Sequence, residues 1–279
     1  MKNKIGIFVI VMVALMAFSS CDPIEKRLEM KGAVTMADVD KLVTVTQEVR
    51  NGKKSNFFKF DTGGLKALTT FQHSLGVVTG STGDYIQCFL FPGSVEVVLT
   101  VLNSDGTALP PKKFNFTIDE AFDVAPQWDM LTASSSKTWV FAGEPGDGKV
   151  WYAMAAPEAM DDGPTGLMSD PIEGIWWNAG ADCCPPADLT GRMVFEANGL
   201  VVTTYASPTA AAKKGTFLFS PDFKEITFKG TNALGSFESD KGGNTHGVYK
   251  IVNLSNNDLF LFTSSSAAGT GWVWRFKPQ

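Results

Sequence analysis

Residues 91–101 read FPGSVEVVLTV, a turn followed by a strand with alternating side chains. Pro92 fixes φ and Gly93 accepts backbone conformations that strain other residues, so the pair suits a tight turn. From Val95 onward, aliphatic residues recur at every second position, which is the period of an extended strand. The stretch therefore predicts a β-strand over residues 95–102 that starts from a tight turn.

The rest of the first half repeats this pattern. Turn residues such as Asp61-Thr62-Gly63-Gly64 separate short runs at roughly 8–12-residue spacing, which is typical of a β-sandwich. A helical period occurs only around residues 36–42. The first domain is expected to end near residues 119–126, so we assign it residues 22–124. Its predicted strands are residues 43–46, 58–60, 67–71, 85–91, 95–102 and 114–118.

The second half, residues 125–279, contains more short strands with longer loops. Residues 193–205 predict a hairpin in which Asn198-Gly199 supplies the positive φ angles of a tight turn. Ser220-Pro221-Asp222 marks a second turn between strands. These patterns predict an all-β protein in which a larger, jelly-roll-like β-sandwich follows the N-terminal one. The other strands expected are residues 216–219, 225–228, 248–252, 259–263 and 272–276.

The charge and histidine content argue against two classes of function. The 279 residues include 24 Lys plus Arg and 29 Asp plus Glu, giving a formal charge of −5. A net acidic protein without a basic run binds polyanions poorly, so nucleic acid is not an expected partner. His73 and His246 are the only histidines, which argues against a multi-histidine metal centre. No cofactor is expected.

Residues 1–21, MKNKIGIFVIVMVALMAFSSC, have the pattern of an export signal. Lys2 and Lys4 precede an apolar run, Ile5–Phe18, that is too short to span a bilayer of ~30 Å and matches the apolar region of a secretory signal peptide. The ending resembles the lipobox of bacterial lipoproteins, which implies that Cys21 is lipidated and tethers the mature chain to the membrane. The alternative is an ordinary secretory signal that leaves Cys21 unmodified.

The other cysteines are Cys88 and the adjacent pair Cys183 and Cys184. Adjacent cysteines can pair with each other only through a strained ring, so the sequence does not indicate a disulfide framework. Their spacing does not indicate a zinc site either. We expect these three cysteines to behave as small, buried apolar residues.

Two resemblances extend this interpretation. Residues 91–101, followed by Asn103 and Gly106, resemble the final hairpin of a PKD domain, an immunoglobulin-like β-sandwich, and the resemblance implies that the alternating aliphatic residues point inward. The second half resembles the C-terminal domain of Bacteroidetes surface lipoproteins from polysaccharide-utilisation (Sus-like) systems. In that family a lipid-anchored PKD-like module carries a sandwich thought to bind glycans beside an outer-membrane transporter. The segments that carry the second resemblance are residues 131–140, 175–180, 214–217 and 272–278.

All seven tryptophans lie within residues 128–274. A flat aromatic ring packs against the C–H groups of a sugar, so exposed aromatic residues suit a glycan-binding surface. Alternation places Trp272 and Trp274 on one face of the last strand, opposite Arg275. We expect the tryptophan face to be core and the opposite face to be wet. Trp139 is also expected to be structural.

Two aromatic pairs are the candidate ligand platform. Neighbouring residues of an extended strand point to opposite faces, so Trp176 and Trp177 cannot both enter one core, and the same holds for Trp151 and Tyr152. The second member of each pair is covered either by a ligand or by a loop. Nearby polar residues would bind the sugar hydroxyls. The candidate carbohydrate-binding residues are Trp151, Tyr152, Trp176, Trp177, Asn178 and Asp182.

The acidic loop Asp161-Asp162-Gly163 could hold calcium, since carboxylates near a glycine suit a hard cation. It lacks the spaced acidic series of a dedicated calcium loop, so a solvated turn is the preferred interpretation. Asp161 and Asp162 stay as weak calcium candidates, and no other metal site is expected.

Catalysis is the main alternative to binding. A glycoside hydrolase needs two suitably spaced carboxyl groups, whereas the pairs Asp119-Glu120 and Asp161-Asp162 are adjacent and would diverge on a strand. The sequence therefore favours a cell-surface, outer-membrane lipoprotein that binds polysaccharide or oligosaccharide non-catalytically, for capture and uptake. Its expected contacts are a glycan, the membrane through the lipid anchor only, and an outer-membrane transporter complex. The alternatives are a glycoside hydrolase or lyase, and a protein-interaction module of an outer-membrane complex.

Overall fold

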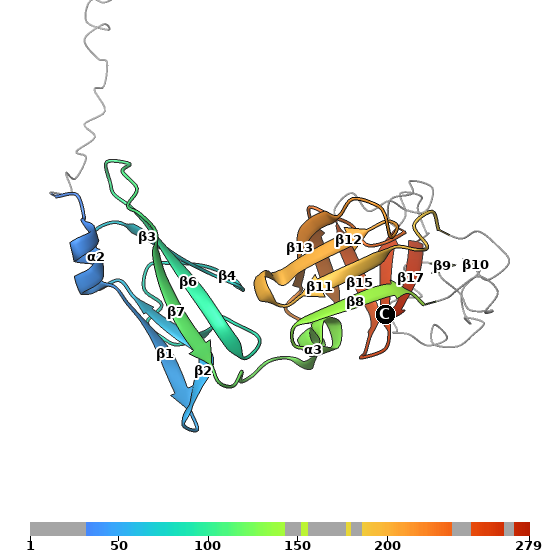
Figure 1. Ribbon diagram of the computed structural model, residues 1–279, viewed down its shortest axis with the longest axis horizontal. Coiled ribbons are helices and arrows are strands. Elements are labelled where there is room, and N and C mark those ends of the chain that lie inside the picture. The colour runs from blue at the N-terminus through green and yellow to red at the C-terminus, as the bar shows by residue number, and fades with distance from the viewer. Residues whose placement is uncertain (1–31, 143–151, 156–176, 180–185, 236–246, 265–270) are drawn as a thin grey trace, which may run out of the picture.

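A computed structural model of the chain describes residues 32–142, 152–155, 177–179, 186–235, 247–264 and 271–279. These residues form an all-β protein with two main hydrophobic cores (Figure 1). We call residues 32–123 the N-terminal unit and residues 124–279 the barrel. The predicted signal peptide and Cys21 lie outside the described residues.

The N-terminal unit consists of two antiparallel sheets that share one core. Strands β1-β2-β5 form the three-stranded sheet and β4-β3-β6-β7 the four-stranded sheet. Phe58 and Phe60 from the first sheet, and Val97 and Leu99 from the second, are fully buried in the same cluster. The elements are α2 (Met36–Leu42), β1 (Thr44–Arg50), β2 (Lys53–Asp61), β3 (Leu68–His73), β4 (Gly76–Thr79), β5 (Ile86–Gln87), β6 (Gly93–Leu102) and β7 (Lys112–Ile118).

The alternating stretch forms β6, as its pattern predicts. Val97, Leu99 and Val101 are buried, and Val95 packs against the same core. The short helix is also confirmed: α2 begins after Thr35, whose hydroxyl and backbone form a reciprocal capping box with Asp38. The strand predicted over residues 85–91 is wrong in extent, because only β5 pairs in that segment.

The second half forms one sheet that closes on itself. Strands follow one another as antiparallel neighbours from β11 to β17, and β17 pairs with β8 through Phe276 and Phe141. The elements are α3 (Pro126–Thr132), β8 (Ser136–Phe141), β9 (Tyr152–Ala155), β10 (Trp177–Ala179), β11 (Arg192–Glu196), the 3₁₀ turn η2 (Asn198–Leu200), β12 (Val201–Tyr205), β13 (Lys213–Phe219), β14 (Glu225–Lys229), β15 (Val248–Leu254), β16 (Leu259–Ser264) and β17 (Gly271–Pro278).

The ten strands of this sheet occupy eight positions around the barrel. On β17, the partner changes from Phe141 of β8 at Phe276 to Tyr152 of β9 at Trp274, so β9 continues the line of β8. In the same way, β10 pairs with β9 and β11 pairs with β8, so β10 and β11 share one line. The result is an eight-position antiparallel barrel, the size at which side chains fill the interior.

The barrel differs from the two facing sheets expected for a jelly-roll-like sandwich. Alternation along each strand is the same in both architectures, and only the long-range pairing of β8 with β17 closes the sheet. The hairpin of residues 193–205 is confirmed as β11 and β12. Its positive φ angles lie at Gly199 (74°) and Leu200 (51°), one residue later than expected.

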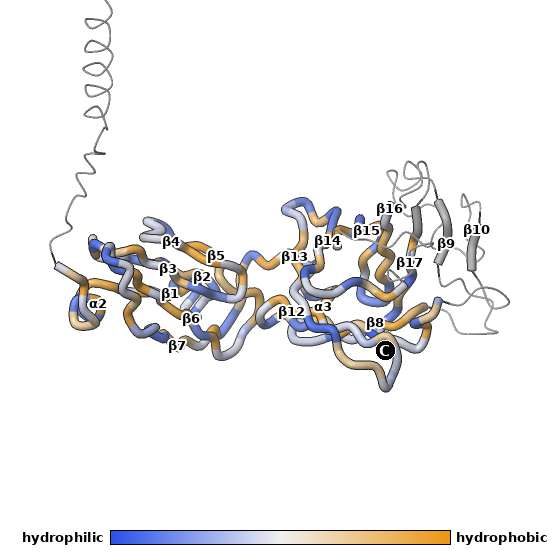
Figure 2. The backbone as a smooth tube through the Cα atoms, turned by 90° about the horizontal axis from the view of Figure 1, so that it is seen from above, coloured by the Kyte–Doolittle hydropathy of each residue, from blue (hydrophilic) through white to orange (hydrophobic). Residues whose placement is uncertain are grey.

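Aromatic residues fill the barrel, and the two ends differ. Trp139, Trp274 and Phe276 are fully buried, as expected, and α3 covers the end nearer the N-terminal unit by placing Trp128 against Phe219, 4.8 Å between ring centroids. Strands β9 and β10 lie at the opposite end, which we call the far end (Figures 1 and 2).

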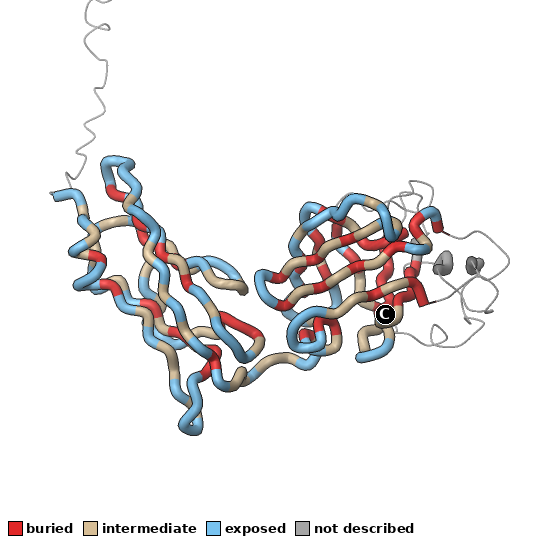
Figure 3. Tube along the Cα trace, in the orientation of Figure 1, coloured by how far each residue is buried: buried red, intermediate tan, exposed pale blue. Residues whose placement is uncertain are grey.

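The outer face of β17 is not wet, contrary to expectation. Arg275 is only 7% exposed, Val273 is fully buried, and the Arg275 guanidinium carbon lies 5.0 Å from the centre of the Phe260 ring. Figure 3 shows in red the buried residues that run through the barrel strands. Phe260 is the residue paired with Arg275 on β16, so the long side chain packs along an apolar neighbour. Both faces are therefore covered over residues 259–263 of β16 and 273–276 of β17.

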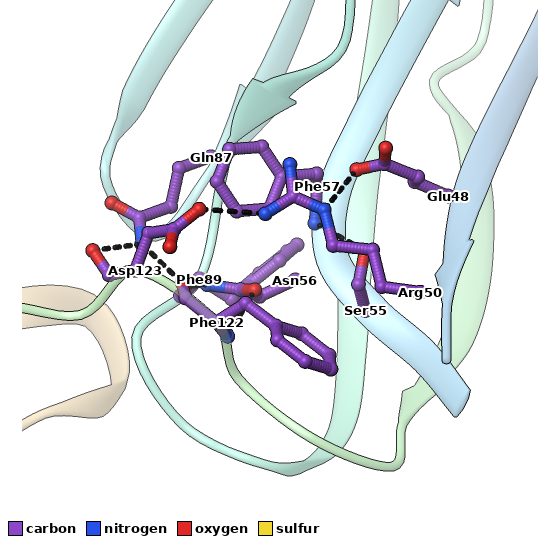
Figure 4. Close-up of polar contacts among 9 residues, drawn as sticks. All are labelled: Glu48, Arg50, Ser55, Asn56, Phe57, Gln87, Phe89, Phe122 and Asp123. Atoms are coloured by element: carbon purple, nitrogen blue, oxygen red, sulfur yellow. Dashed lines mark hydrogen bonds and ion pairs between the residues drawn. The ribbon is translucent and has the colours of Figure 1, made fainter. Parts of the chain in front are cut away.

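A polar clamp fixes the chain where it leaves the N-terminal unit (Figure 4). The buried Asn56 amide nitrogen donates to the carbonyls of Phe89 (2.8 Å) and Phe122 (3.1 Å), and its oxygen accepts from the Phe122 N–H (2.8 Å). Arg50 forms an ion pair with Asp123 at 2.6 Å. Gln87 donates to the carbonyl oxygens of Phe122 and Asp123. We call these contacts the linker clamp.

The linker between the clamp and α3 is short and anchored at both ends. Val124 and Ala125 pack against the barrel core, and Pro126 starts α3. From the other side, Leu90 is part of the barrel core cluster, and Leu75 and Phe91 pack against it. The clamp and this apolar contact together hold the N-terminal unit against the barrel.

Replacing Asn56 by Ala should lower the free energy of unfolding of the N-terminal unit by about 2–3 kcal/mol, because buried backbone groups lose their partners. Urea unfolding followed by circular dichroism would measure the change, with hydrogen exchange assigning it to residues 32–123. Asn115→Ala, at an exposed site on β7, is the matched control and should change stability by less than about 0.5 kcal/mol. Equal effects of the two substitutions would contradict the role of the clamp.

Candidate ligand-binding sites

The far end of the barrel brings together strands that carry predicted carbohydrate-binding residues. Tyr152 pairs with Trp274, and Met154 pairs with both Trp272 and Trp177. Residues paired across neighbouring strands share a face of the sheet, as do residues two apart on one strand. Positions 152, 154, 177 and 272 therefore belong to the face that carries Trp274. Trp274 itself is buried in the barrel core.

The structure brings together two of the six candidate residues. Trp177 pairs with Met154, which lies two residues from Tyr152 on β9, so positions 152 and 177 are neighbours on one face of the sheet. Asn178 pairs with Ala153 and belongs to the other face. The alternation argument that separates Trp176 from Trp177 and Trp151 from Tyr152 is not tested, because only one residue of each pair is described. The candidates outside the described residues are Trp151, Trp176, Asp182, Asp161 and Asp162.

A buried carboxylate supports the barrel wall beneath these positions. Asp188 accepts hydrogen bonds on both oxygens from the Gly235 N–H, at 3.0 and 2.8 Å. Gly235 has φ +80°, and a Cβ placed there would lie 2.4 Å from the Trp274 ring. The bonds to Asp188 therefore hold the backbone directly against the indole. Sequence reasoning missed Asp188, which stands alone after two prolines without any motif.

Gly235→Ala should destabilise the barrel by about 3 kcal/mol, because it adds a steric clash with Trp274 to the strain of a left-handed backbone. Gly230 is the matched control: its φ is +87°, but the nearest atom to an added Cβ is at 3.3 Å. Gly230→Ala should therefore show the backbone strain alone, about 1–2 kcal/mol. Thermal unfolding followed by tryptophan fluorescence would compare the two variants. Equal losses of stability would contradict the close contact between Gly235 and Trp274.

A second candidate site is the open cleft between the two units, with a volume of about 1180 Å³. One wall is formed by residues of β1, β2, β3, β6 and β7, together with β4 and the turn that leads into it. The other is formed by β13, β14 and η2. Figure 1 shows β4 and β6 on one side of the space between the units and β13 on the other. Its size exceeds the roughly 300–1,000 Å³ of small-molecule pockets, so it can take an extended ligand.

The charges at the cleft are distributed unevenly. Glu96, on β6, is already paired with Lys113 at 3.1 Å. Lys54 and Lys229 line opposite walls, and within the described residues neither ammonium group is part of an ion pair. Two cationic donors thus remain for a ligand, while the carboxylate is partly neutralised.

His73 lies where the cleft meets the contact between the units. Its Nδ1 is 3.2 Å from the Cys88 carbonyl and 3.3 Å from the Leu75 N–H, and its ring stacks beside Phe60. Burial lowers the pKa of His73, and the hydrogen bond to the Cys88 carbonyl opposes this only in part. Burial also raises the pKa of the Cys88 thiol to about 12, so this cysteine is the inert apolar residue expected.

Acidification should destabilise the N-terminal unit through His73. The unfolded chain takes up a proton near the ordinary pKa of about 6.5, while the folded chain resists it. The stabilisation is therefore complete above that pH and is lost as pH falls toward the lower folded pKa. Urea unfolding at pH 7.5 and pH 5.5 should show a larger loss for the wild type than for His73→Gln, which stays neutral. Identical losses would show that His73 does not titrate in this way.

The described part of the cleft offers hydrogen-bonding groups rather than an acid–base pair. Glycosidic hydrolysis needs two carboxyl groups about 5–9.5 Å apart, and Glu96 is the single carboxylate among the described lining residues. Within those same stretches of chain, three or more His, Cys, Asp or Glu side chains never gather in a way that could hold a metal ion. None of the described helices has the length and apolar character to cross a bilayer.

No protein-family model matches the chain, and comparison with curated proteins finds no similar sequence. The residues and geometry of the two candidate sites therefore have to carry any functional conclusion. At the far end, aromatic residues occupy neighbouring positions on one face of β9, β10 and β17. The cleft is lined by polar and cationic side chains.

Proposed function

We propose that this protein binds polysaccharide or oligosaccharide at the cell surface without cleaving it, for capture and uptake. The mature chain is anchored to the outer membrane through lipidated Cys21. Its N-terminal unit is a PKD-like, immunoglobulin-like sandwich that acts as a spacer, and its barrel is the binding module. An outer-membrane transporter is the expected partner complex.

The observation that carries this proposal is the grouping of aromatic positions at the far end. Strands β10, β9 and β17 align Trp177, Met154 and Trp272 in one register row, next to the row of Tyr152 and Trp274. Indole and phenol rings pack well against the C–H face of a sugar, and barrel ends are frequent ligand sites. A cluster of aromatic positions on one face supports a platform for a sugar ring.

The position of the anchor agrees with this arrangement. The described chain begins at Gly32, next to α2, which lies at the end of the N-terminal unit away from the barrel (Figure 1). A lipid at Cys21 would thus place the N-terminal unit near the membrane and the far end of the barrel away from it. Such an order suits capture of long chains from outside.

The double substitution Trp177→Ala and Trp272→Ala should weaken polysaccharide binding at least tenfold, because the sugar loses its stacking surface. Affinity electrophoresis of the mature chain would measure this with laminarin, pullulan, xylan and polygalacturonate. Tyr85→Ala is the matched control, since Tyr85 is 39% exposed on the N-terminal unit. It should leave binding unchanged.

Three outcomes would contradict the proposal. Retention of none of the four polysaccharides would remove the basis for glycan binding, and unchanged binding by the double variant would remove the far end as the site. Release of reducing ends from a bound polysaccharide would instead identify a hydrolase.

A further inference from the structure

We propose that the cleft between the N-terminal unit and the barrel is a second carbohydrate-binding site, which holds a stretch of the polysaccharide chain. The identification of the ligand as a carbohydrate rests on the proposed function. The location of the site does not, because the strands that line the cleft are not those at the far end of the barrel. The N-terminal unit is then a part of the binding surface and more than a spacer.

Uncharged hydrogen-bonding side chains occur on both walls. Six of these side chains form no hydrogen bond with another described residue, so their amide and hydroxyl groups are available to a ligand. Sugar hydroxyls donate and accept at once, which amides and hydroxyls match better than a single charged group does. These side chains are Gln72, Ser94 and Asn115 on the N-terminal wall, and Asn198, Thr216 and Thr227 on the barrel wall.

Exposed aliphatic side chains complement these polar groups. Val77 of β4 is 62% exposed and Leu218 of β13 is 53% exposed, and they line opposite walls of the cleft. Covering such exposed aliphatic side chains with a ligand removes apolar surface from water, which makes the free energy of binding more favourable. The C–H faces of a sugar chain provide such a cover, while its hydroxyl edge reaches the amides. A purely polar peptide or nucleotide would leave these residues wet.

The free lysines add two charge-assisted donors. Lys54 and Lys229 face the cleft from opposite walls without an ion pair among the described residues. An ammonium group donates up to three hydrogen bonds, to hydroxyl oxygens or to the carboxylate of a uronic acid. The carboxylate of Glu96 is held by Lys113, which reduces repulsion of an acidic sugar.

The walls are held in place before a ligand arrives. The linker clamp fixes Phe122 and Asp123, and just before them the Lys54 N–H donates to the Asp119 side chain at 2.9 Å. Leu75, a lining residue of the N-terminal wall, packs against the barrel core and so ties this wall to the barrel. Preorganised walls avoid the ordering cost that weakens binding to a flexible groove.

The test uses the mature full-length chain and the same four polysaccharides. A cleft variant, Asn115→Ala with Lys229→Ala, removes one donor from each wall. Lys66→Ala with Asn257→Ala is the matched control, because both residues are exposed and neither lines the cleft. The cleft variant should lose at least fivefold in affinity for the retained polysaccharide, and the control should not. Hydrogen exchange of the wild type should slow in β6, β7, β13 and β14 when the polysaccharide is added.

The outcomes separate the two proposals. Wild-type affinity of the cleft variant, without protection of those four strands, overturns the cleft site and leaves the far end untouched. Loss in the cleft variant but not in Trp177→Ala with Trp272→Ala supports the cleft and overturns the far end. Failure of the wild type to retain any of the polysaccharides overturns both. If a co-purified protein, and not the polysaccharide, slows hydrogen exchange in these four strands, the carbohydrate site in the cleft is also overturned.

Discussion

The buried amide of Asn56 is the contact on which the arrangement of the two units depends. Its three hydrogen bonds tie β2 to the loop at Phe89 and to the chain at Phe122, which then enters the barrel. Because an amide presents both donor and acceptor, one side chain satisfies backbone groups from two distant segments. The ion pair of Arg50 with Asp123 reinforces the same point of the chain. Without this clamp, the apolar contacts of residues such as Leu75, Leu90 and Phe91 with the barrel core would be left to set the width of the cleft.

Closure of the sheet has a comparable role in the barrel. Pairing of β17 with β8 closes the sheet, and the same strand then pairs with β9 toward the far end. The stack of Trp274 on the Gly235 backbone fixes the interior below that end. A rigid wall with aromatic positions above it is suited to binding, because the contact surface is already formed.

Much of the local structure follows from the sequence, whereas the sites depend on long-range contacts. Alternation from Val95 to Val101 and the helical period around residues 36–42 are local signals, and both predict the observed elements. Barrel closure depends on residues 139–141 meeting residues 276–278, which alternation cannot encode. Arg275 illustrates the same limit: its charge predicts a side chain that faces water, whereas its pairing with Phe260 on β16 places it along an apolar ring. The cleft joins residues such as Gln72 and Thr216 from separate units, so no pattern within either unit indicates it.

The central claim, that the two units are held in one orientation, is open to direct measurement. Spin labels at Thr79→Cys on β4 and Lys224→Cys before β14 would report the distance between the units by pulsed electron paramagnetic resonance. Cys183 and Cys184 would be replaced by Ser, and buried Cys88 would stay unlabelled. The account predicts one narrow distance distribution that broadens in Asn56→Ala. A broad distribution in the otherwise wild-type chain would contradict it, because the cleft would then have no fixed walls.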